Sequence, residues 1–317
     1  MKPIFFSPLQ GYTEDAYRRI HAELAGGVDA YYTPFLRVEH GKLRSKDMRD
    51  VRPEFNEGVA VVPQIIANSA AEVDLLFDYV AGLDRYDTID LNMGCPFPLQ
   101  TRHGRGAGLM SEVAKVREVV GRLRLRCDEQ ASSGKKLVNF SVKMRLGLES
   151  LDEWQAVLPV IEEYAPIHIT MHPRVAKQQY GGELYMEEFE RFYESAKLPI
   201  VYNGDICTLE DLRRIEERYP RLKAVMIGRG LLARPSLATE CAEGAEWSSE
   251  RRMALVIEMH NRLLEHFRNI IPGEEQLLSK VRTFWDYMEE ELGRKAFKKI
   301  KKAGNMKNYL RAVGELG

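Results

Sequence analysis

The chain has 317 residues, of which 44% are hydrophobic and 29% are charged. This length exceeds what one ordinary hydrophobic core needs and suits a large barrel with a small additional unit. The 46 basic and 47 acidic side chains give a formal net charge of −1. That balance excludes a protein that coats nucleic acid or membrane through bulk positive charge, so any polyanionic partner must bind a local patch.

Two further classes of protein are disfavoured by sequence patterns. The longest nearly apolar stretch, residues 60–67, is interrupted by Pro63 and Gln64 and is too short to span a bilayer. The N-terminal residues MKPIFFSPLQGY lack the long apolar region of a secretory signal, and the four cysteines are widely spaced without a CxxC pair. We therefore expect a cytoplasmic monomer with no membrane contact, no disulfide framework and no metal site.

From the N-terminus to about residue 235, the chain repeats a short apolar run, a polar loop and a segment with helical periodicity. Compact runs rich in β-branched residues are typical of parallel strands that are buried on both faces. Eight strands are predicted, at residues 4–9, 30–35, 59–67, 88–93, 140–146, 168–172, 199–203 and 224–227.

Helical segments are predicted between these strands at residues 70–83, 111–126 and 208–219, the last of them capped by Thr208. Strands and helices that alternate in this way over roughly 240 residues predict an α/β fold, a (β/α)8 TIM barrel. A doubly wound open sheet is the alternative.

The strand pattern stops after Pro235, and three helices are predicted at residues 248–269, 274–292 and from about 294 to 316. Pro272-Gly273 and Gly293 separate them. We place a domain boundary here, with residues 1–243 as the barrel and residues 244–317 as a small all-α helical domain. Residues 294–311 hold eight Lys or Arg and no acid, so the remainder of the chain carries a net charge of −9. Such a run is either a solvated helix face or a polyanion contact.

Polar and glycine residues recur where the predicted strands end. In a (β/α)8 barrel, these ends and the loops after them form the functional face. The candidate residues at the strand ends are Pro8, Leu9, Gln10, Gln64, Asn92, Cys95, Lys143, Arg145, His172, Arg174, Asn203, Gly204, Asp205, Gly228, Arg229 and Gly230.

The loops after the seventh and eighth strands are NGD at residues 203–205 and GRG at residues 228–230. Glycines allow backbone N–H groups to approach phosphate oxygens, and Arg229 adds a charge-assisted bond. Either loop alone could simply be a tight turn. Because barrels commonly bind phosphate at these two strands, the two loops together favour a phosphate-bearing ligand.

The sequence allows more than one role for each of three side chains. Lys143 interrupts an apolar strand, where an ammonium needs an acid such as Asp90, an anionic ligand or a Schiff-base function. His172 is either a core histidine or a catalytic one. Gln64 either contacts a heterocycle edge or closes a backbone gap.

Cys95 lies just after a strand in NMGCP and is followed by a glycine-rich loop that contains Arg102 and Arg105. A cysteine in a partly exposed, basic environment is a candidate acid or nucleophile, whereas most free cysteines are inert. Cys127, Cys207 and Cys241 are assigned the inert role.

Six motifs then occur in order over residues 4–235: SPLQGYTEDAYRR, LNMGCP with GRGAGLM, SVKMRLG, MHPR, PIVYNGDI and MIGRGLLARP. Together they resemble the tRNA-dihydrouridine synthases of bacterial type. The resemblance implies noncovalently bound FMN, NADPH (or NADH) as electron donor, and reduction of a uridine in the D-loop of tRNA to 5,6-dihydrouridine. It also implies that the helical tail binds tRNA.

Carried over by position, the resemblance makes Cys95 the general acid that protonates C5 of the uracil, while reduced FMN delivers hydride to C6. The FMN contacts implied are Pro8, Leu9, Gln10, Gln64, Lys143, His172, Asn203, Gly204, Asp205, Gly228 and Arg229. The implied tRNA contacts are Asn92, Arg174, Arg102 and Arg105, and we add Lys298, Lys299, Lys301 and Lys302 from the basic run.

The chain departs from the family pattern at two positions: Pro98 stands where the family often has Lys, and Glu14 replaces the usual Asp. Three alternatives to the family function are open. They are an FMN barrel that acts on a free pyrimidine, as in dihydroorotate dehydrogenases, an RNA-binding barrel that no longer catalyses, and a lyase that uses Lys143. The helical tail separates the first alternative from a tRNA enzyme, because a small-molecule enzyme does not need it.

Overall fold

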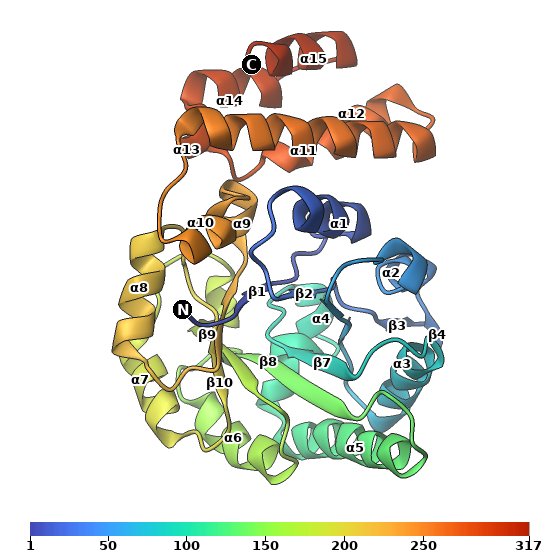
Figure 1. The fold of residues 1–317 in the computed structure, drawn as a ribbon. Helices are drawn as coiled ribbons and strands as arrows, with labels where there is room; N and C mark the ends of the chain where they lie inside the picture. Colours follow the sequence, from blue (N-terminus) through green and yellow to red (C-terminus); the bar gives the residue numbers. More distant parts are fainter. Residues whose placement is uncertain (317) are drawn as a thin grey trace.

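The computed structural model describes residues 1–316 and has the predicted barrel, with helices around a parallel sheet (Figure 1). The sheet order is β5-β2-β1-β11-β10-β9-β8-β7-β6, and every neighbouring pair is parallel. The strands are β1 (Ile4–Phe6), β2 (Ala30–Tyr32), β5 (Val61–Val62), β6 (Gln64–Ile65), β7 (Thr88–Met93), β8 (Asn139–Gly147), β9 (Ile169–Val175), β10 (Ile200–Tyr202) and β11 (Ala224–Ile227).

The nine strands occupy the eight predicted positions because the third predicted strand is divided at Pro63. Its two pieces lie at opposite ends of the sheet order, because β5 pairs with β2 and β6 pairs with β7. The barrel therefore closes through this divided strand. Proline lacks the N–H that a continuous central strand would donate. Its carbonyl still accepts a bond of 2.9 Å from the N–H of Asp90.

Other boundaries differ from the prediction. The sixth barrel strand, β9, continues three residues beyond its predicted end at His172, to Val175, so Arg174 lies within the strand and not in the loop after it. A short hairpin, β3 (Val38–Glu39) and β4 (Lys42–Leu43), was not predicted. Its turn residues His40 and Gly41 have φ of 51° and 73°, the left-handed values that favour a two-residue hairpin turn.

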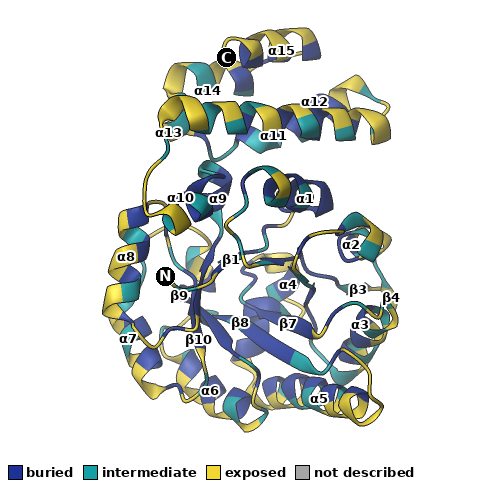
Figure 2. Ribbon diagram, in the orientation of Figure 1, coloured by how far each residue is buried: buried dark blue, intermediate teal, exposed yellow. Residues whose placement is uncertain are grey.

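Helices cover the outside of the barrel and bury one face each, as Figure 2 shows. Thr208 caps α8 as predicted: its side chain accepts from the N–H of Asp211, whose carboxylate accepts from the N–H of Thr208. The barrel helices are α1 (Asp15–Leu24), α2 (Ser45–Arg49), α3 (Ala70–Gly82), α4 (Pro98–Thr101), α5 (Val113–Ser132), α6 (Glu153–Glu163), α7 (Met186–Ser195), α8 (Leu209–Arg218), α9 (Arg229–Ala233) and α10 (Leu237–Glu243).

The tail is helical, as predicted. Two of the three helix predictions are wrong, because the structure divides each of those segments into two helices. The prediction at 274–292 becomes α12 (Glu274–Arg282), a short turn at Thr283–Trp285 and α13 (Glu289–Leu292). The prediction at 294–316 becomes α14 (Arg294–Lys301) and α15 (Met306–Gly314). Only α11 (Ser249–Ile270) is continuous. Gly317, the last residue of the predicted tail domain, lies outside the described residues.

The break after α12 places Trp285 in the centre of the tail. Its side chain is fully buried and donates a hydrogen bond of 2.8 Å from Nε1 to the hydroxyl of Tyr309, which lies 2.7 Å from Nε2 of His260. Burying these polar atoms together satisfies them inside an apolar core. The helix is therefore interrupted where a tertiary contact outweighs helical periodicity.

The tail packs on the barrel through α11 and α12. The ammonium of Lys280 lies 2.6 Å from the carboxylate of Glu14, and the hydroxyl of Tyr12 donates to Asp286 at 2.9 Å. These contacts fix residues 286–290 beside the ends of the barrel strands. In the described part of the chain, no helix combines the length and the apolar character needed to cross a membrane.

Candidate active site

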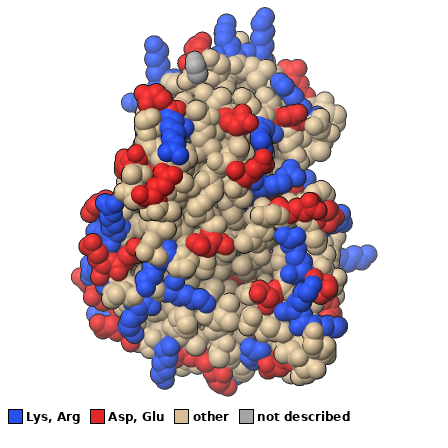
Figure 3. All heavy atoms as spheres, viewed as in Figure 1, with Lys and Arg blue, Asp and Glu red and all other residues tan. Residues whose placement is uncertain are grey.

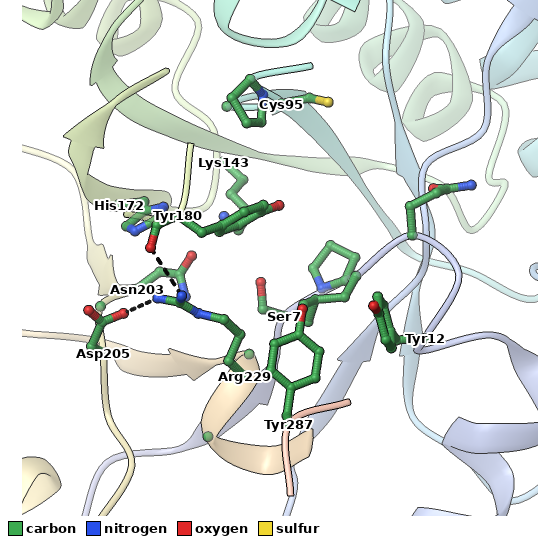
Figure 4. A pocket seen from close by; sticks show the side chains of 18 of the residues that line it. Ser7, Tyr12, Cys95, Lys143, His172, Tyr180, Asn203, Asp205, Arg229 and Tyr287 are labelled. Carbon is green, nitrogen blue, oxygen red and sulfur yellow. Dashed lines mark hydrogen bonds and ion pairs between the residues drawn. The ribbon is translucent and has the colours of Figure 1, made fainter. Parts of the chain in front are cut away.

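A cavity of about 880 Å³ opens at the carboxyl ends of the barrel strands, a size typical of cofactor and ligand sites. Cys95 and Arg229 reach it from opposite sides, with Lys143 and His172 on the wall between them (Figure 4). Thirteen of the predicted site residues line it: Pro8, Leu9, Gln10, Gln64, Asn92, Cys95, Lys143, His172, Asn203, Gly204, Asp205, Gly228 and Arg229.

Asn92, the last-but-one residue of β7, fixes the start of the Cys95 loop. Its Oδ1 accepts from the N–H of Cys95 at 2.8 Å and from the N–H of Gly94 at 3.0 Å, while its Nδ2 donates to Oε1 of Gln64 at 2.8 Å. Both ends of the amide are therefore occupied. In this arrangement, Asn92 positions Cys95.

The same network continues beneath the cavity to a fully buried carboxylate. Gln64 donates from Nε2 to Asp90 at 2.7 Å, and the hydroxyl of Ser141 donates to the other carboxylate oxygen at 2.6 Å. Burial raises the pKa of Asp90 to about 6, and these two hydrogen bonds with the nearby Lys143 limit the rise. Gln64 thus closes a polar network that orients the cysteine loop.

We expect Asp90→Asn to change how stability depends on pH. The carboxyl binds its proton more tightly in the folded chain than in the unfolded chain, where its pKa is 3.8. Its contribution to stability is therefore fully present below about pH 4 and is lost as the pH rises through 6. Between pH 4 and 7, the wild type should lose up to about 3 kcal/mol relative to the Asn variant.

Urea unfolding at pH 4, 5, 6 and 7 measures this difference. Asp84→Asn is the control, because that side chain is solvent-exposed and should follow the wild type at every pH. Parallel curves for wild type and Asp90→Asn would show that Asp90 does not carry the raised pKa.

Cys95 itself is 7% exposed. Burial raises the pKa of its thiol, against the opposing influence of the Phe97 N–H and of the cations Arg145 and Lys143. A thiol with a raised pKa keeps its proton at neutral pH. The site therefore offers a proton donor at this position and not a thiolate nucleophile.

The wall between the two ends of the cavity is cationic. Burial and the neighbouring Arg145 lower the pKa of Lys143 to about 8, so that it stays largely protonated at neutral pH. Arg145 donates from Nε to the carbonyl of Gly94 at 2.9 Å, and its guanidinium lies 5.5 Å from the ring centre of Tyr180. These groups suit a ligand that is anionic or becomes so.

His172 is neutral. Burial lowers the pKa of its imidazole well below the usual value, and the surrounding cations lower it further. Arg174 lies 3.1 Å from Nε2 and has only donors, so Nε2 accepts and the proton sits on Nδ1. His172 is thus a hydrogen-bonding group at neutral pH and not an acid.

The two glycine loops form the opposite end of the cavity. Within residues 1–316, no acceptor is found for the backbone N–H groups of Gly204, Asp205 and Gly228. A Cβ on Gly204 would lie 1.9 Å from the Tyr202 hydroxyl, so the loop requires glycine there. Free N–H donors beside the guanidinium of Arg229 fit a phosphate group.

The side chain of Asp205 has a role different from that of the loop N–H groups. Its carboxylate accepts from Arg229 at 2.6 Å and from Arg174 at 3.1 Å, and the hydrogen bonds to these two cations lower its pKa below the usual value in spite of burial. A carboxylate repels phosphate, so Asp205 offers a phosphate only its N–H and uses its side chain to orient the two arginines.

Several predicted substrate contacts do not line the cavity. Arg174 is buried against Asp205 and the carbonyl of Gly182. Arg105 bonds the carboxylate of Glu72, with Nε 3.0 Å from Oε2, and so anchors its loop. Arg102 is exposed, and its side chain has no hydrogen bond or ion pair with residues 1–316.

None of the four tail lysines lines the cavity. Basic side chains project from the part of the surface that α14 and α15 form (Figure 3). Lys301 pairs with Asp286, and Lys299 with Glu315. Lys298 and Lys302 are exposed and have no ion pair with the described residues.

The cavity also contains residues that the sequence prediction missed. Arg145, which the sequence places with Lys143 at the end of the fifth predicted strand, also lines the cavity, although no role was predicted for it. The residues that the tail contributes to the cavity could not be predicted from a local sequence pattern, because they are distant in sequence from the barrel strands that they meet. The missed lining residues include Tyr12, Tyr180, Asp286, Tyr287, Glu289 and Glu290.

Among curated proteins, the chain is 28% identical to the tRNA-dihydrouridine(16) synthase of Neisseria meningitidis serogroup A over 75% of its length and 70% of that protein. It is 29% identical to the enzyme of the same name from Pseudomonas syringae pv. tomato, over 75% of the chain and 74% of that protein. A human tRNA-dihydrouridine(47) synthase-like protein is 29% identical over 60% of the chain but only 28% of its own length.

Solved structures of similar shape include the old yellow enzyme from Trypanosoma cruzi, with a TM-score of 0.51 and 9% identity over 77% of this chain and 89% of that one. This likeness supports the barrel fold alone. The family model for dihydrouridine synthase matches residues 5–313, nearly the whole chain. The chain is an oxidoreductase that belongs to the dihydrouridine synthase family.

Proposed function

We propose that this protein reduces a uridine in the D-loop of tRNA to 5,6-dihydrouridine, with bound FMN and with NADPH as electron donor. The observation that carries the proposal is the buried thiol of Cys95, whose pKa burial raises, at one side of a cavity that Lys143 lines and whose far end suits a phosphate. These are the groups that a flavin-dependent reduction of a pyrimidine needs.

The residues present fit FMN. Pro8 and Leu9 offer apolar surface for the ring system, Lys143 adds a positive charge to the lining, and Arg229 with the free loop N–H groups suits the phosphate. When bound and reduced, FMN supplies the hydride that adds to C6 of the uracil.

The chain's own residues supply the proton and hold it in place. Addition at C6 builds enolate-like charge on the uracil, and the thiol of Cys95 relieves it by giving its proton to C5. Asn92 holds the backbone of this cysteine, Gln64 holds Asn92, and Asp90 holds Gln64. The network keeps the donor in one position as the base enters.

We propose that residues 244–317 contact the tRNA and that uridine 16 is the target. Two relatives with 28% and 29% identity, each aligned over at least 70% of its length, bear the name tRNA-dihydrouridine(16) synthase, whereas the position-47 protein is matched over less than a third of its length. The tail also forms one side of the cavity through Asp286 and Tyr287, a feature that an enzyme for free pyrimidines does not need.

Mapping dihydrouridine in tRNA from a strain that lacks the gene tests this target. Dihydrouridine should disappear from position 16 and return when the wild-type gene is restored. A profile that is unchanged at every tRNA position would refute the proposed substrate, and a loss at another position would refute the choice of uridine 16.

The tail lysines should contribute unequally to tRNA binding. Lys298 and Lys302 are free to release counterions from RNA phosphates, whereas Lys301 is paired with Asp286. Replacing both free lysines with Ala should reduce the slope of log affinity against log salt by about 1 to 2. Lys301→Ala should leave the slope unchanged.

Titration of tRNA binding between 50 and 300 mM salt, on the order of the range where such contacts dominate, measures the slopes. If the Lys298→Ala/Lys302→Ala variant keeps the wild-type slope, the phosphate contact lies elsewhere on the protein.

A further inference from the structure

Two large apolar side chains are exposed directly after the proton donor. Phe97 is 48% exposed and lines the cavity, and Leu99, two residues later, is 65% exposed. Single exposed apolar residues are ordinary on protein surfaces. Two of them on one short turn, two and four residues after Cys95, form an apolar rim at the point where a substrate must enter.

The backbone beneath this rim is firmly held. The carbonyl of Phe97 accepts from the N–H groups of Gln100 at 2.8 Å and Thr101 at 3.1 Å, and proline stands on both sides of Phe97. The N–H of Ala107 bonds the carbonyl of Cys95 at 3.1 Å and joins the two ends of the loop.

The far part of the loop is anchored as well. The side chain of Asn68 donates to the carbonyl of His103 at 2.7 Å, and Arg105 is paired with Glu72. An exposed aromatic ring on a backbone held at both ends is a preorganised surface, because little conformational entropy remains to be lost when a ligand packs on it.

We infer that Phe97 is a stacking platform for an unpaired base that neighbours the target uridine, with Leu99 extending the apolar surface. This inference rests on the proposed function. Proteins bind single-stranded RNA by stacking bases on aromatic side chains next to basic groups that contact the backbone. Arg102, exposed and unpaired at the end of the same turn, supplies such a group.

The position of Phe97 indicates which base it contacts. The target base must lie inside the cavity, where the thiol of Cys95 can reach C5. Phe97 lies at the rim, half in solvent, so the base that it meets is one that stays outside when the target uridine is extruded from its stack. Phe97 is thus a positioning residue for the RNA and does not take part in the chemistry.

Phe97→Ala should raise KM for tRNA roughly ten-fold, equivalent to about 1.4 kcal/mol. The rate at which NADPH reduces the flavin in the absence of RNA should be unchanged, and Phe97→Trp should restore a KM near that of the wild type. Leu125→Ala is the matched control, because this side chain is 47% exposed on α5 and lies outside the cavity. Its KM should stay at the wild-type value.

A tRNA ligated from synthetic halves, with an abasic residue on one side or the other of the target uridine, identifies the stacked base. At one of these two positions, the abasic change should lower kcat/KM roughly ten-fold for the wild type and for Leu125→Ala but have little further effect on Phe97→Ala. Equal abasic effects in all three proteins at both positions, or an unchanged KM in Phe97→Ala, would overturn the inference. A wild-type protein that forms no dihydrouridine in any tRNA would instead refute the proposed function.

Discussion

Cys95→Ala should lower the rate of dihydrouridine formation in tRNA by about 100- to 10,000-fold, the range that a positioned general acid contributes. The variant should bind FMN as the wild type does, because the main-chain hydrogen bonds that hold Cys95 in its loop do not involve its sulfur. The N–H of Cys95 still donates to Asn92, and its carbonyl still accepts from Ala107. Single-turnover rates with pre-reduced enzyme measure the chemical step directly.

Cys207→Ala is the control for this variant. Cys207 lines the same cavity but is exposed, and we assign it no part in the reaction. Its replacement should leave the single-turnover rate near that of the wild type. If Cys95→Ala retained a tenth or more of the wild-type rate, Cys95 would not be the proton donor.

Gly106→Ala should remove most of the activity by a different route, through displacement of the cysteine loop. Gly106 has φ of 58°, and a Cβ there would lie 2.7 Å from Cβ of Cys95 and 2.8 Å from its carbonyl oxygen. Neither the loop backbone nor Cβ of Cys95 can yield without moving the thiol. We expect a loss of stability of about 1–3 kcal/mol and a fall of at least about ten-fold in the single-turnover rate.

Gly104→Ala is the control that distinguishes the effect of backbone strain from the effect of the steric clash at Gly106. Gly104 has φ of 65°, but a Cβ there meets nothing closer than the ammonium of Lys115, at 3.8 Å. It should lose about 1 kcal/mol of stability and keep the wild-type rate. Urea unfolding and single-turnover kinetics on both variants make the comparison, and equal rates for the two would show that Gly106 does not set the position of Cys95.

The barrel was predictable because its signals are local. Buried parallel strands are continuous apolar runs, and each of the eight predicted runs contains a strand. The break in the third was visible as Pro63. The tail was harder, since the interruption at Trp285 depends on partners, His260 and Tyr309, that lie 24 or more residues away.

The site was predictable to the extent that barrel topology brings strand ends together. Thirteen predicted residues line one cavity because parallel strands all point their carboxyl ends to the same face. The charge partners were not predictable. Asp205 was assigned to a phosphate, whereas its carboxylate lies between Arg174 and Arg229, and the adjacency of three strand ends is a property of the folded barrel.

The same limit applies to the basic run in the tail. Lys301 was predicted to contact tRNA together with the neighbouring lysines. In the folded chain, it pairs with Asp286, which lines the cavity. Of the lysines singled out, Lys298 and Lys302 retain free charges. A charge run read along the chain therefore overstates the surface that remains for RNA.

The central claim is that this cavity reduces a uridine of tRNA. Its most direct test is to incubate the purified, FMN-loaded protein with unmodified tRNA transcripts and NADPH, and then to map dihydrouridine at each position. We expect dihydrouridine at position 16 with the wild type and almost none with Cys95→Ala. Oxidation of NADPH with reduction of a free pyrimidine, and no dihydrouridine at any tRNA position, would contradict it.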